Sequence, residues 1–143
     1  MRMRGLHRYF IAVCLLLTSC GNSQAPVGRW EGLLDSPSWI IAVRLQVDDG
    51  NAIRASALSA NVDGMTLPAK LDVAHQLKTA ITAQWPQAVR GQVDFQNDTM
   101  TRAGGVAPLF VFDPHARTMT FYFYAGGKFT EKVLCLPVEN FGG

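Results

Sequence analysis

The sequence predicts an α+β fold, a curled and mostly antiparallel sheet of about six to seven strands with one central amphipathic helix. Residues 39–47 alternate apolar and polar side chains, which is typical of a strand with one buried face and one wet face. Residues 68–85 instead place their apolar side chains along one side of a helix. Further β-rich runs follow this helix, so the sheet is expected to contain strands from both sides of it.

The first 19 residues have the organisation of a secretory signal peptide. Arg2, Arg4 and Arg8 precede an almost continuous apolar run over residues 9–17, and two small residues follow it. The run is about half the length of roughly 20 residues that a membrane-spanning helix needs. We therefore expect residues 1–19 to be cleaved rather than to remain as a transmembrane segment.

Leu17-Thr18-Ser19-Cys20 ends this segment and resembles the lipobox of bacterial lipoproteins. The resemblance implies that Cys20 carries a diacylglyceryl group and further acyl chains such as palmitate, and that it becomes the first residue after cleavage. Two or more chains give stable membrane attachment. Gly21, where some lipoproteins have an Asp that retains them at the inner membrane, implies an outer-membrane anchor facing the periplasm. The alternative is that Cys20 is an ordinary buried or disulfide cysteine in a core strand.

The predicted organisation is therefore a signal peptide (1–19), a lipidated cysteine with a flexible tether (20–27), and a single α+β periplasmic domain (28–143). Of the 13 basic residues, three lie in the signal, which leaves 10 against 11 acidic residues and a formal charge of about −1. Such a balance does not favour a nucleic-acid partner. Cys135 remains as the one thiol outside the signal and the anchor, so no disulfide is expected within the domain.

The first half of the domain reads as three strands and a helix. Residues 28–34, 39–47 and 52–60 are separated by turn-forming stretches, and the small side chains of the third run leave room for a bulky partner. The helix over residues 68–85 is that partner. Thr66 is expected to cap its start, with Pro68 in the first turn and Pro86 preventing continuation.

The second half reads as four more β-rich runs, at residues 88–95, 109–112, 118–124 and 129–136. A longer loop around residues 104–105 is expected between the first two, and tight turns join the last three into a meander. Tyr122 and Tyr124 are expected on an exposed aromatic face, which makes them the candidate interaction residues.

The sequence contains no convincing catalytic or metal-binding motif. His75 and His115 lack any metal-ligand spacing, the serines have turn or strand roles, and Cys135 lies in an apolar run that favours an inert buried thiol. No cofactor and no metal are therefore expected, and no catalytic residue is assigned.

Gly28-Arg29-Trp30, at the head of the first strand, is similar to the Gly-x-Trp that opens lipocalins and related calycin barrels. The leading hypothesis is a membrane-anchored, non-enzymatic binding domain with an envelope protein as partner. The alternative, which the calycin resemblance implies, is a carrier of small apolar ligands. A hydrolytic enzyme is the third.

Overall fold

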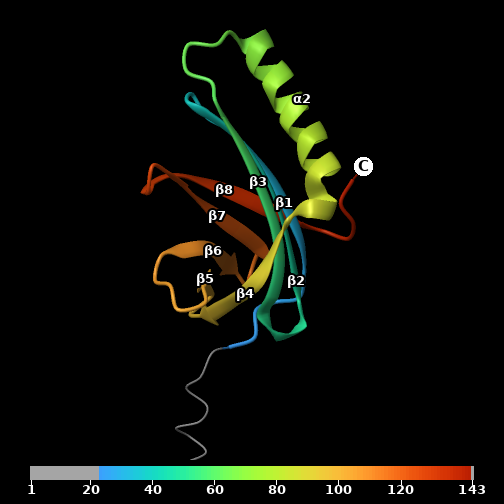
Figure 1. Ribbon diagram of the computed structural model, residues 1–143, viewed down its shortest axis with the longest axis vertical. Helices are drawn as coiled ribbons and strands as arrows, with labels where there is room; N and C mark the ends of the chain where they lie inside the picture. The colour runs from blue at the N-terminus through green and yellow to red at the C-terminus, as the bar shows by residue number, and fades with distance from the viewer. Residues whose placement is uncertain (1–22, 143) are drawn as a thin grey trace, which may run out of the picture.

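The computed structural model describes residues 23–142 (Figure 1). The described chain folds into eight strands, one α-helix and two short 3-10 turns. The strands are β1 (Gly28–Asp35), β2 (Trp39–Asp48), β3 (Ala52–Asn61), β4 (Val89–Gln96), β5 (Thr99–Arg102), β6 (Pro108–Asp113), β7 (Thr118–Ala125) and β8 (Lys128–Val138). The helix is α2 (Leu67–Gln84), and the 3-10 turns are η1 (Asp49–Asn51) and η2 (Trp85–Gln87).

The strands form a closed antiparallel barrel in sequence order, because β1 pairs with β8 as well as with β2. The prediction of a mostly antiparallel sheet with one helix is confirmed, but the sheet is a closed barrel of eight strands rather than a curled sheet of six to seven. The missed strand is β5, only four residues long. It follows a tight turn at Asn97 and Asp98, whose φ angles of 50° and 60° suit a two-residue hairpin loop.

The inside of the barrel is filled by apolar side chains that point inward from the strands. Trp30 lies among them, packs edge-on against Phe112 at a centroid distance of 6.3 Å, and donates from Nε1 to the carbonyl of Arg117 at 2.9 Å. The other buried members of this core are Ala25, Ile41, Val43, Leu45, Val47, Val93, Phe95, Met100, Phe110, Phe112, Met119, Val133 and Cys135.

Helix α2 lies on the outside of the barrel, along β2 and β3 (Figure 1). Thr66 caps it as predicted, its Oγ1 accepting from the backbone N–H of Ala69 at 3.4 Å, and Pro68 stands in its first turn. The helix covers the face of β2 that was expected to be wet. Ile40, Ala42 and Arg44 are consequently buried on that face. The helix expected at the centre of the sheet thus packs on the outer side of the barrel.

Residues just before β1 close one end of the barrel, which we call the base. The backbone N–H of Ser23 donates to Phe95 O at 2.9 Å, and that of Ala25 donates to Oδ1 of Asn51 at 2.6 Å. Ala25 is fully buried. Residues 23–25 are therefore part of the folded domain, although the sequence suggested that the domain begins at Gly28.

The strand register defines which turns share the base. Gly28 at the start of β1 lies opposite Val47, next to the β2–β3 turn, and Arg29 lies opposite Val138 at the end of β8. Lys128, at the start of β8, therefore belongs to the far end of the barrel.

Candidate functional site

The two candidate tyrosines lie on β7 and share one neighbour. Tyr122 and Tyr124 are both half-buried, and their rings lie 5.7 Å and 6.2 Å from the ring of Phe129 on β8. Tyr124 donates its hydroxyl to Pro108 O at 2.9 Å, and Lys132 Nζ lies 5.2 Å from the centroid of Tyr122. Tyr124 is thus held by a structural bond, whereas Tyr122 presents its ring and Lys132 to the outer surface.

Next to these rings, the outer face of β8 carries large apolar side chains in the open. Phe129, Leu134 and Leu136 are 51%, 57% and 54% exposed, and Leu33 of β1 is 39% exposed. Glu31 pairs with Leu136, so continuing the β1–β8 register by two residues puts Leu33 opposite Leu134. We call these four residues the β8 strip. Leu33, Leu134 and Leu136 are neighbours on this face, whereas Lys132 lies between them and Phe129. Single exposed apolar residues are common, but a group of neighbouring ones marks an interaction surface.

A sequence signal for this strip lies in β8 itself. Residues 133–136 are all apolar, and successive side chains of a strand point to opposite faces. Val133 and Cys135 fill the interior, so Leu134 and Leu136 have to face outward. Where nothing covers the outer face of a barrel strand, every second side chain of a continuous apolar run is exposed to solvent.

Arg44 is the buried charged side chain of β2, and all of its contacts hold structure together. Its Nε lies 3.6 Å from Glu31 Oε2, and its Nη2 donates to Thr82 Oγ1 at 3.0 Å and to Gly142 O at 2.8 Å. The guanidinium also lies over the ring of Phe141 at 5.0 Å. Arg44 therefore fastens α2 and the segment after β8 to the barrel wall.

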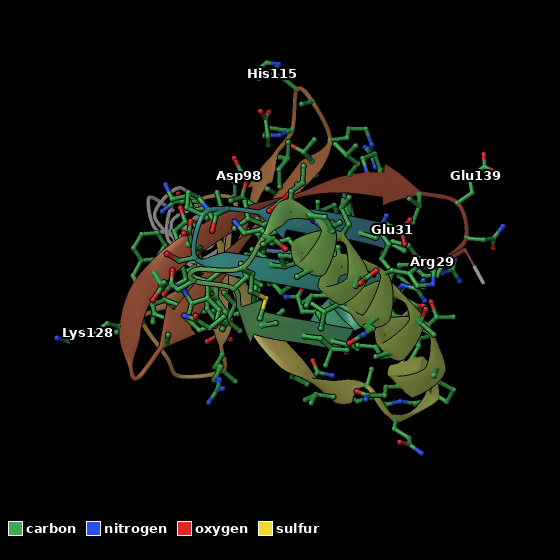
Figure 2. The ribbon with its side chains drawn as sticks, turned by 90° about the horizontal axis from the view of Figure 1, so that it is seen from above. Arg29, Glu31, Asp98, His115, Lys128 and Glu139 are labelled. Atoms are coloured by element: carbon green, nitrogen blue, oxygen red, sulfur yellow. The ribbon has the colours of Figure 1, made fainter. Side chains whose placement is uncertain are left out.

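The two histidines of the domain do not form a site. His75 and His115 are exposed and lie far apart, one on α2 and the other in the β6–β7 turn, where Figure 2 shows it at the edge of the molecule. Among residues 23–142, no three His, Cys, Asp or Glu side chains gather closely enough to hold a metal ion. Cys20, the predicted lipidation site, lies outside the described residues.

Cys135 points into the core, as expected for an inert thiol. It is fully buried, and its Sγ donates to Val133 O at 3.7 Å. Burial raises the pKa of this thiol from its usual 9.0 to about 12. Because the thiolate is the nucleophile, Cys135 is unreactive in the folded protein at neutral pH.

This burial predicts a specific pH dependence of stability. Between pH 9 and about 12 the unfolded thiol ionises while the folded one stays protonated, so the native state loses stability as the pH rises. Below pH 9 both states keep the proton and the contribution is constant. The unfolding free energy in urea should therefore fall more steeply above pH 9 for the native sequence than for Cys135→Ala. Parallel declines would contradict the burial of this thiol.

Within the described part of the chain, no helix combines the length and the apolar character needed to cross a membrane. Comparisons with protein families, with curated proteins and with solved structures find no match. An eight-stranded antiparallel barrel is nevertheless an architecture compatible with lipocalin-like carriers. The fold alone does not assign a function, because one fold can host many different sites.

Proposed function

We propose that this protein is a lipid-anchored lipoprotein of the bacterial outer membrane, facing the periplasm, and that it acts without enzymatic activity by binding an envelope protein. The observation that carries the binding function is the β8 strip. Its centre of Leu33, Leu134 and Leu136 is bordered on the same face by polar groups: Lys132, Thr120 opposite Leu134, and Glu31 opposite Leu136. An apolar centre with a polar rim is the usual anatomy of a protein–protein interface.

The anchor and the fold together orient the domain. Cys20 precedes Ser23 by three residues, and three extended residues span at most about 11 Å. Ser23 is bonded to the base of the barrel through Phe95. A lipid on Cys20 consequently holds the base close to the membrane surface. Strand β8 runs from the far end to the base, so the β8 strip stands along the barrel wall, where a periplasmic partner reaches it from the side.

The aromatic residues beside the strip suit a protein partner. Tyr122 contributes a large ring with few rotatable bonds, so ordering it on binding costs little conformational entropy. Phe129 bridges both tyrosines and is half-exposed itself. Such aromatic side chains, already packed against each other, are pre-organised to form the centre of an interface.

The second candidate function is a carrier of small apolar ligands, which the closed antiparallel barrel favours. In such a carrier the ligand occupies the barrel interior. Here that space is taken by Trp30, Met100 and Met119, each at most 1% exposed, together with the other core residues. The filled interior makes the carrier the weaker of the two proposals.

The anchor is tested by replacing the lipidated residue. Cys20→Ala should abolish labelling by radioactive palmitate and leave an unprocessed precursor, because no thiol remains at the cleavage site. Cys135→Ala is the matched control, since its thiol is buried, and it should keep both the label and the processing. Labelling of the Cys20→Ala chain would contradict the anchor.

The β8 strip is tested by photo-crosslinking in cells that express the full chain. A photo-reactive phenylalanine analogue at Tyr122 should give one discrete adduct with an envelope protein. Adding Leu134→Lys should remove the adduct, because a charge then faces the apolar surface of the partner. Leu134 is already exposed, so this change should alter the unfolding free energy by less than about 0.5 kcal/mol.

The control for that experiment is Val106→Lys, which adds the same charge at a side chain that is 94% exposed in the β5–β6 loop. It should leave the adduct intact. Equal adducts with and without Leu134→Lys would overturn the assignment of the strip.

A further inference from the structure

We infer that the outer face of β3 and β4, near the base, binds a phosphate group between Arg54 and Arg90. The strand register lines up four polar side chains across four strands: Arg29 of β1 lies opposite Gln46 of β2, Gln46 opposite Arg54, and Arg54 opposite Arg90. Residues that lie directly opposite in an antiparallel pair share a face of the sheet. Two arginines are therefore immediate neighbours on the barrel exterior.

This arrangement is electrostatically unfavourable without an anion. Like charges directly opposite each other on neighbouring strands destabilise a sheet. Arg44 is paired with Glu31, but among the described residues no carboxylate lies within ion-pair distance of Arg54 or Arg90. Arg29 lies at the other end of the row. Its Nε donates a hydrogen bond to Gln46 Oε1 at 3.2 Å, and its Nη1 donates one to the backbone carbonyl of Glu139 at 3.0 Å. Figure 2 shows both residues on the same side of the barrel. The two uncompensated charges are thus Arg54 and Arg90.

Arg54 is held in position before any ligand arrives. Its Nη2 donates to Trp85 O at 2.7 Å, and its guanidinium carbon lies 4.7 Å from the centroid of the Trp85 ring. Trp85 is fixed in turn by Phe141, with centroids 4.6 Å apart. The Nε of Arg54 is shielded from water and lacks a hydrogen-bond partner, so neither water nor a protein acceptor compensates that part of the charge. An anion in the neighbouring pocket would offset this charge through space, because an atom shielded from water is also shielded from direct contact with a phosphate oxygen.

A surface pocket of about 500 Å³ lies at this place, and both arginines line it. Gln92 adds a side-chain amide to the pocket. The amide of Gln46 is already hydrogen-bonded, because its Oε1 accepts from Arg29 and its Nε2 donates to Asp48 at 3.1 Å. Arginine presents planar N–H donors that match the oxygens of a phosphate group. Asp48 also lines the pocket, and its charge should weaken binding without preventing it.

The phosphate has two possible sources, a free phosphate compound or a phospholipid headgroup. The pocket includes Ala52 and Asp48 next to the β2–β3 turn, so it lies close to the base. The lipid source rests on the proposed function, which puts the base at the membrane, whereas the site itself does not depend on the anchor. Soluble probes keep the two questions apart.

The experiment is calorimetric titration of the detergent-solubilised full chain at low ionic strength with inorganic phosphate and, separately, with glycerophosphoglycerol, a soluble phosphodiester headgroup. We expect saturable binding of at least one probe. Arg90→Gln should weaken it at least tenfold, and Asp48→Asn should strengthen it. Arg90 is exposed, so its replacement should leave the fold intact, unlike Arg54, which packs against Trp85. Lys128→Gln removes the same unit of charge at the far end and should change nothing (Figure 2).

Stronger binding of inorganic phosphate would support a free phosphate compound, and equal or stronger binding of the diester would support a lipid headgroup. The absence of saturable binding by both probes would overturn the site. So would an equal loss in Arg90→Gln and Lys128→Gln, because binding would then follow net charge alone. Neither result bears on the anchor, which the palmitate labelling of Cys20 decides.

Discussion

Strand β2 is buried on both of its faces, and the positions of the other elements follow from this. Its inner face contributes Ile41, Val43, Leu45 and Val47 to the barrel core, while its outer face buries Ile40, Ala42 and Arg44. This outer face carries two apolar residues and one arginine. The element packed on it must therefore offer apolar side chains and hydrogen-bond acceptors for the guanidinium. Helix α2 supplies both, with Ile81 buried against the wall and Thr82 bonded to Arg44. The helix is therefore fixed on the outside, and the wall at β8 and β4 stays bare.

Much of this fold follows from local patterns. The helix, its cap at Thr66 and seven of the strands are encoded by short-range signals of periodicity and turn chemistry. The outward placement of the helix was harder to predict, because Ala42 and Arg44 look like the polar side of an amphipathic strand. Only the contacts of Arg44 with Glu31, Thr82 and Gly142 explain how this charge is buried. Local sequence patterns also could not predict that the barrel closes, because closure depends on the pairing of β1 with β8, more than 100 residues apart in sequence.

The candidate site was only partly predictable for a related reason. Tyr122 and Tyr124 were identified from alternation along one strand, and that reasoning extends to Leu134 and Leu136. Leu33 and the pair of Arg54 with Arg90 depend on register between strands, which no single stretch of sequence specifies. Cys20 is the opposite case, because its role was inferred entirely from the residues around it.

Because side chains fill the interior of this barrel, a binding site is expected on its outer surface. The β8 strip and the Arg54–Arg90 pair lie on different parts of the wall, one apolar and one cationic. The proposed lipid on Cys20 would orient both surfaces relative to the membrane. In the proposed function, the core provides rigidity, the anchor would fix the location and the outer wall would bind the partner. The division differs from that of a carrier barrel, whose interior is the binding site.

The orientation of the base toward the membrane is the central claim, and spin labels measure it directly. Nitroxides placed by Asp49→Cys in the β2–β3 turn and by Lys128→Cys at the far end report their distance from a nickel-chelating lipid through paramagnetic relaxation. The buried Cys135 does not compete for the label. Relaxation should be clearly stronger at position 49 than at position 128 when the chain is on membranes. Equal relaxation at the two positions, or stronger relaxation at position 128, would contradict it.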